Sequence, residues 1–204
     1  MTLATKLHAL TGATQAEAAF IDEAIALLGE AVSDAGFLTT VCEAEYVATR
    51  WTPAEGPQRS FTSAQIATRI GEGRERGAVA DQTLDLALDL IDLPGPESGK
   101  QVLGSTALGV LPVHTARWFV SRCMAASEGR GDPVNFASHL MHEWCHVSGF
   151  SHWPDNKARG DTAYVVGRLV RELLTPRHGA RIDPAITALM ADIETDCGCR
   201  GNAG

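Results

Sequence analysis

The sequence predicts an α+β fold: a small, partly antiparallel sheet from the middle of the chain packs on a long helix, with further helices at both ends. Leucines at every second position of residues 83–93 indicate a strand that buries one face. Residues 14–34 carry apolar side chains at helical spacing. Asp132 and Pro133 form a helix start before a second apolar segment of helical period.

The chain has 204 residues, of which 45% are hydrophobic and 21% are charged, values typical of one compact globular domain. We therefore interpret residues 1–204 as a single domain, in which residues 1–36 are a candidate N-terminal helical extension. The formal net charge of −8 and the lack of any run of lysines and arginines argue against a nucleic-acid partner.

No apolar run is long enough to cross a bilayer, so no membrane partner is expected. Lys6 and His8 interrupt the apolar core that a secretory signal would need. This favours a cytoplasmic location and leaves secretion without a leader open. The five cysteines are an odd number and are scattered apart from Cys197 and Cys199, so reduced thiols are expected rather than a disulfide framework.

Glycine and proline divide the chain upstream of residue 130 into short segments. These are a helix at 14–34, a β-prone piece at 38–42, an ambiguous piece at 43–51, a helix at 63–70, and strands at 83–93, 101–113 and 116–123. The strand at 101–113 is rich in glycine and small residues, which often mark a bulge or the close approach of another backbone. Downstream, helices are expected at 133–148, 161–174 and 184–195.

Residues 142–152 carry the pattern HExxHxxGxxH, which is built for a metal ion. His142 and His146 stand one helical turn apart on the same face, and neutral imidazole is a normal zinc ligand. Glu143 is next along the helix and can reach a water on the metal without ligating the metal. Gly149 permits a sharp turn at the helix end, which returns His152 to the ion as a third ligand. Three protein ligands leave one position open, as in catalytic zinc sites.

These five residues resemble the zinc signature of the metzincin clan of metallopeptidases. The resemblance covers residues 132–152 and implies a zincin-like fold, with Zn²⁺ held by His142, His146 and His152. It also implies a hydrolase that cleaves peptide bonds in a peptide or protein substrate, with Glu143 taking a proton from the attacking water.

In metzincins an edge strand upstream of the zinc helix pairs with extended substrate, and residues 101–113 are the candidate here; an ordinary core strand with a bulge is the alternative. The clan also has a methionine in a tight turn beneath the zinc. Downstream of His152 the sole methionine is Met190, in a segment that looks helical, so the chain departs from the family pattern. Cys197 and Cys199 belong either to a frayed tail or to a thiol that blocks the zinc.

Four further residues are candidates for supporting roles. Tyr164 either donates to the oxyanion that forms during hydrolysis, as in some zincins, or is a packing residue. Asp155 or Asp161 orients a zinc-binding histidine through its second ring nitrogen. His139 lies one turn before His142 and is expected at the rim of the site or in a supporting position.

The same residues support three functions. The first is a zinc-dependent metallopeptidase. The alternatives are a zinc hydrolase of a non-peptide amide or ester, and a noncatalytic, zinc-stabilised interaction module. Glu143 argues against the third, because a structural zinc site does not need that carboxylate. The sequence leaves the oligomeric state open.

Overall fold

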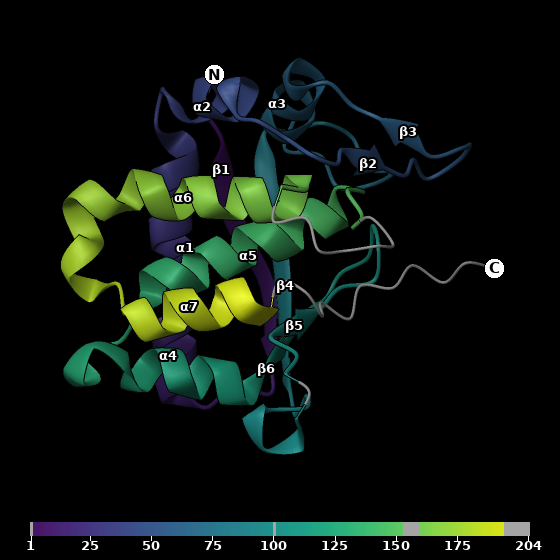
Figure 1. The fold of residues 1–204 in the computed structure, drawn as a ribbon. Coiled ribbons are helices and arrows are strands. Elements are labelled where there is room, and N and C mark those ends of the chain that lie inside the picture. Colours follow the sequence, from purple (N-terminus) through teal and green to yellow (C-terminus); the bar gives the residue numbers. More distant parts are fainter. Residues whose placement is uncertain (1, 100, 153–159, 194–204) are drawn as a thin grey trace.

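A computed structural model describes residues 2–99, 101–152 and 160–193, and within these the protein is a mixed α+β fold (Figure 1). The α-helices are α1 (Gln15–Ser33), α2 (Phe37–Glu43), α3 (Ser63–Gly71), α4 (Arg117–Gly129), α5 (Pro133–Val147), α6 (Thr162–His178) and α7 (Pro184–Ile193). The strands are β1 (Ala4–Thr11), β2 (Arg50–Trp51), β3 (Arg59–Ser60), β4 (Thr83–Ile91), β5 (Gly104–Ser105) and β6 (Val113–Ala116). The predicted α+β class is confirmed.

The main sheet has four strands in the order β1-β4-β6-β5. β1, β4 and β6 are parallel, and β5 runs antiparallel to β6 at the edge. The sheet is therefore mixed, as predicted, but it does not come only from the middle of the chain. β1 was not predicted, because its side chains are mostly exposed and carry no strong alternation of apolar and polar residues. β2 and β3 form a separate antiparallel pair.

β4 confirms the clearest strand prediction. Alternate residues of this strand are buried, and they are the four leucines Leu84, Leu86, Leu88 and Leu90. β4 lies between β1 and β6 in the sheet, and its buried leucines face the hydrophobic core.

Two predicted β segments are helices. Residues 38–42 belong to α2, in which Phe37 and Val41 are buried four residues apart. Residues 117–123 belong to α4, in which Phe119, Val120 and Cys123 are buried with helical spacing. Both predictions were wrong because β-branched and aromatic side chains favour strands locally, whereas packing against the core decided for a helix.

The helices form a layer on the sheet, and α5 lies at its centre (Figure 1). α5 packs against α1, α4 and α6, and all fifteen of its residues are buried. This confirms the helix predicted at 133–148. One hydrophobic core extends from Leu3 to Met190, so the N-terminal residues that form β1 and α1 contribute to the same core as the central helix.

No single helix in the described part of the chain is long and apolar enough to cross a bilayer. By length and composition alone, α1 and α2 taken together pass that test, but they are bent by 73° relative to each other. The apolar side chains of α1 are buried in the protein core.

Candidate metal centre

The start of α5 is held by a buried carboxylate. Asp132 is the N-cap, and its Oδ1 accepts a hydrogen bond from the backbone N–H of Asn135 at 2.9 Å, while Pro133 occupies the first turn. Burial raises the pKa of Asp132, although hydrogen bonds from Asn135 and Asp183 oppose that shift. The helix start predicted from these residues is therefore confirmed. It begins the helix that carries His142 and His146.

The end of α5 turns sharply at Gly149, as predicted. Gly149 has a φ of +107°, in the left-handed region that favours glycine. The segment that follows is held by β2 and the residue after it. The backbone N–H of Thr52 donates to the carbonyl oxygen of Gly149 at 2.8 Å, and the backbone N–H of Ser151 donates to the carbonyl oxygen of Arg50 at 2.9 Å. β2 thereby positions the residue immediately after Ser151, which is His152.

Gly149→Ala is expected to destabilise the protein and to weaken metal binding. A Cβ at this position would lie 2.8 Å from the carbonyl oxygen of Thr52 and 2.8 Å from the Trp51 ring nitrogen, in addition to the strain of a positive φ. Strain of that kind alone costs about 1–2 kcal/mol. Denaturant unfolding and zinc titration measure the two effects.

Gly129→Ala is the matched control. Gly129 also has a positive φ, +83°, but a Cβ there would meet nothing within 4 Å. This variant should show the strain alone, with unchanged metal affinity. Equal losses of stability in the two variants would contradict the close contact at Gly149.

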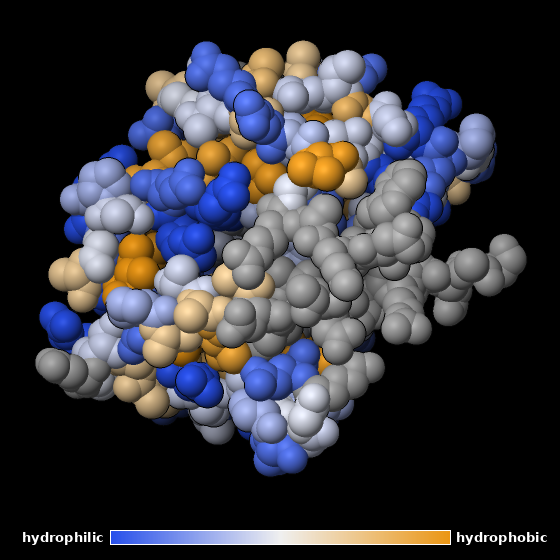
Figure 2. Space-filling view, viewed as in Figure 1, coloured by the Kyte–Doolittle hydropathy of each residue, from blue (hydrophilic) through white to orange (hydrophobic). Residues whose placement is uncertain are grey.

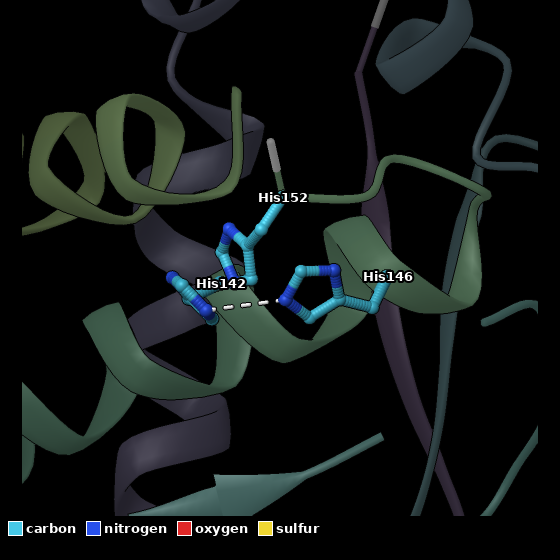
Figure 3. Close-up of side chains that lie close together, drawn as sticks. All are labelled: His142, His146 and His152. Atoms are coloured by element: carbon cyan, nitrogen blue, oxygen red, sulfur yellow. Dashed lines mark hydrogen bonds between the residues drawn. The ribbon is translucent and has the colours of Figure 1, made fainter. Parts of the chain in front are cut away.

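The three predicted ligands come together. The side chains of His142 and His146 on α5 and of His152 in the segment after it point toward one another (Figure 3). One ring nitrogen from each lies within 4.8 Å of the others, close enough to hold a metal ion. All three residues are buried. The His142 and His146 Nε2 atoms are 3.2 Å apart, near the roughly 3.3–3.4 Å separation of two nitrogens on a tetrahedral zinc ion.

Hydrogen bonds select the nitrogens that are available to a metal. His146 Nδ1 lies 2.7 Å from the carbonyl oxygen of Phe150, which can only accept, so Nδ1 carries the proton and Nε2 has the lone pair. His152 Nδ1 faces a carboxylate oxygen of Asp161 with the same consequence. This pattern is typical of histidines that bind a metal. The donor set therefore fits a zinc ion.

Of the two carboxylates that were candidates for this position, Asp161 is the one that faces His152. Asp155 lies outside the described residues. Asp161 is 2% exposed, and its second oxygen accepts from the backbone N–H of Tyr164 as the N-cap of α6. One buried side chain therefore starts α6 and also orients His152.

Asp161→Asn is expected to lower zinc affinity about 10- to 100-fold, because the orienting partner of His152 loses its charge. Asparagine caps helices as well as aspartate does, so α6 should stay intact. Competition with a chelating dye measures the affinity. Asp183→Asn is the control, since Asp183 accepts from the backbone N–H of Ala185 at the start of α7 and holds no member of the cluster. Unchanged affinity in Asp161→Asn would contradict the orienting role.

Glu143 lies beside the three histidines and is 2% exposed. Thr106 Oγ1 donates to its Oε2 at 2.5 Å, and His139 Nδ1 is 3.8 Å from its Oε1. Gly104 of β5 leaves room for the carboxylate, since a Cβ there would be 2.8 Å from Glu143 Oε1. His139 is buried beside Glu143, which fits the second of the two places predicted for it, a supporting position rather than the rim. Thr106 was missed, since it is 37 residues away and no local pattern marks it.

Tyr164 packs on the cluster. Its ring centroid is 4.5 Å from that of His142 and 4.7 Å from that of His152, with a nearly parallel stack on His152. These contacts support the packing role directly. Tyr164 also lines the same pocket as His142 and Glu143, and its role as an oxyanion donor stays a prediction.

Met190 also lines this pocket, but it lies in α7 and not in a tight turn. Cys145, between Glu143 and His146, is fully buried, and burial raises the pKa of its thiol, so it stays protonated. Cys197 and Cys199 lie outside the described residues.

No protein-family model, no curated protein and no solved structure was found to match this chain. The class of site is therefore defined by its own geometry. It is a buried cluster of three histidines, His142, His146 and His152, close enough together to bind a metal ion.

Proposed function

We propose that the protein is a zinc-dependent metallopeptidase that hydrolyses peptide bonds at this cluster. One observation carries the proposal: a buried carboxylate, Glu143, shares the pocket with His142 and is held by Thr106. A metal site that serves only to stabilise a fold is closed by its ligands and does not need an additional carboxylate beside them.

The residues divide the chemistry between them. Zn²⁺ suits three neutral imidazoles and, when bound, supplies a Lewis acid that acidifies water and polarises a carbonyl group. His146 and His152 keep their Nε2 lone pairs toward the cluster through their Nδ1 partners. Glu143 takes a proton from the attacking water and passes it to the leaving amine. Thr106 keeps the carboxylate in place for both transfers.

We assign the substrate-pairing strand to β5, within the segment 101–113 that the sequence suggested. β5 is the last strand in the sheet order, so one of its edges has no partner strand in the described structure. Gly104 lies directly beside Glu143. An extended peptide that added to this edge would pass the carboxylate, with main-chain hydrogen bonds holding it in register.

The proposal is tested by incubating the zinc-loaded protein with a mixed peptide library and with acyl esters and amides, each with and without a chelator. Peptide cleavage that the chelator abolishes is the expected result. Chelator-sensitive cleavage of the acyl compounds alone would make the protein a non-peptide hydrolase. Absence of chelator-sensitive turnover on either set would favour an interaction module.

A further inference from the structure

The pocket beside the three histidines is lined in part by two arginines. The residues that line it include His142, Glu143, Arg168 and Arg171. Arg168 and Arg171 therefore share a pocket with the proposed general base. Figure 2 shows hydrophilic side chains next to hydrophobic ones in the region of α6, the helix that carries both arginines.

The backbone of α6 runs closely along α5, which brings the arginines near the cluster. A Cβ at Gly167 would be 2.8 Å from the carbonyl oxygen of Ser138 and 3.3 Å from the Cβ of His142. Tyr164, Arg168 and Arg171 follow at positions i, i+4 and i+7, so they share one helix face. Tyr164 stacks on the histidines, so this face starts at the metal site and continues along the pocket.

The positions of Arg168 and Arg171 on α6 give their distances from Tyr164 along the helix. With a rise of 1.5 Å per residue, Arg168 and Arg171 lie about 6 Å and about 10 Å along α6 from Tyr164. The guanidinium groups extend away from the histidines, since Arg168 contacts Glu172 one turn further along α6 and Arg171 contacts Asn135 near the start of α5. An extended peptide advances about 3.3 Å per residue. The two positions on α6 therefore correspond to about two to three residues of extended peptide, counted from Tyr164 beside the histidines.

Among the described residues that line the pocket, two arginines stand against one glutamate, while the whole chain carries a net charge of −8. These lining residues are therefore more positive than the chain as a whole. Arg168 also contacts Glu172, at 3.4 Å, but both side chains are about half exposed, and such surface pairs contribute little. Arg171 Nη1 donates to Asn135 Oδ1 at 3.3 Å, which fixes the guanidinium at the pocket wall.

We propose that this pocket selects substrates that carry a carboxylate about two to three residues from the hydrolysed bond, bound by Arg168 and Arg171. This inference rests on the proposed peptidase function. Arginine binds carboxylates through paired N–H donors, and such charge-assisted hydrogen bonds are the strong ones. The carboxylate belongs either to an acidic side chain or to the C-terminus of a short peptide.

The experiment uses four matched forms of each short peptide, with glutamate or glutamine at one position and with a free or amidated C-terminus. The position is moved along both sides of the cleaved bond, and kcat/KM is measured with the zinc-loaded protein. A preference for glutamate identifies a side-chain carboxylate, and a preference for the free acid identifies the C-terminus. Equal kcat/KM for all four forms at every position overturns the proposal.

Arg168→Gln and Arg171→Gln should each reduce the preference about tenfold, the effect of losing one charge-assisted hydrogen bond. Arg122→Gln is the matched control, because Arg122 is exposed on α4 and does not line the pocket. Arg168→Lys and Arg171→Lys should restore part of the preference. A purely structural role would instead change the melting temperature and affect all four peptide forms equally.

A binding measurement separates this inference from the peptidase proposal. Fluorescence anisotropy with labelled peptides on the zinc-loaded Glu143→Gln protein gives Kd without turnover. Tighter binding of the carboxylate-bearing forms that is lost in Arg168→Gln supports the inference even where no cleavage is found. Cleavage by the parent protein without any difference in Kd or kcat/KM refutes the inference and leaves the peptidase proposal standing.

Discussion

Glu143→Gln is expected to lower kcat for peptide hydrolysis by about 10²–10⁴-fold, the usual contribution of a general acid–base group. Glutamine keeps the size of the side chain and can still bond to Thr106, but it cannot accept a proton from water. The three histidines are unchanged, so zinc content should stay at the parent value. Turnover kinetics together with metal analysis by mass spectrometry provide the measurement.

The control for this variant is Glu97→Gln, an exposed glutamate in the short 3₁₀ helix after β4. It removes the same charge from the surface and should leave both turnover and metal content unchanged. If Glu143→Gln cleaves peptides as fast as the parent, Glu143 is not the general base. If it loses zinc, the carboxylate contributes to metal binding and the division of roles given above is wrong.

His146→Ala is expected to lose both zinc and activity. His146 is central to the cluster, since its Nε2 is 3.2 Å from that of His142 and its ring centroid is 4.5 Å from that of His152. Removing it leaves two of the three imidazoles of the cluster. We expect zinc to be retained at less than a tenth of the parent stoichiometry after dialysis, a loss at least as large as the roughly 10- to 100-fold effect of removing a ligand's orienting partner.

His114→Ala serves as the control, because it removes an imidazole from β6 that is about two-fifths exposed and lies outside the cluster. Its zinc content should equal that of the parent. The pair of results separates the two kinds of residue: Glu143→Gln stops chemistry with the metal in place, whereas His146→Ala removes the metal. Full zinc content in His146→Ala would mean that the ion is bound elsewhere.

The prediction of the fold succeeded where one helix or strand carries its own periodic pattern. β4 was predicted from alternating leucines, and α5 from its cap and its apolar spacing, because such periods follow directly from backbone geometry. The failures have the opposite cause. β1 pairs with a strand almost eighty residues away, and α4 has strand-forming side chains that its core contacts hold in a helix.

The residues of the site also fall into those that local spacing predicts and those that come from distant parts of the chain. His142, Glu143 and His146 occupy neighbouring positions on one helix, so their spacing alone predicted that they would act together. Thr106, which holds Glu143, and Asp161, which faces His152, come from other parts of the chain. The sequence placed Asp161 among two candidates and gave no indication of Thr106.

The sequence by itself determined the central helix and singled out the three histidines and the glutamate next to His142, because the spacing of residues on a helix is a property of near neighbours. Only the tertiary structure decided how that site is held and what surrounds it. β2 fixes the segment that carries His152, β5 brings Gly104 and Thr106 to Glu143, and α6 aligns Arg168 and Arg171 along the pocket. These contacts join residues far apart in the chain, and they form because separate elements bury their apolar faces in one core.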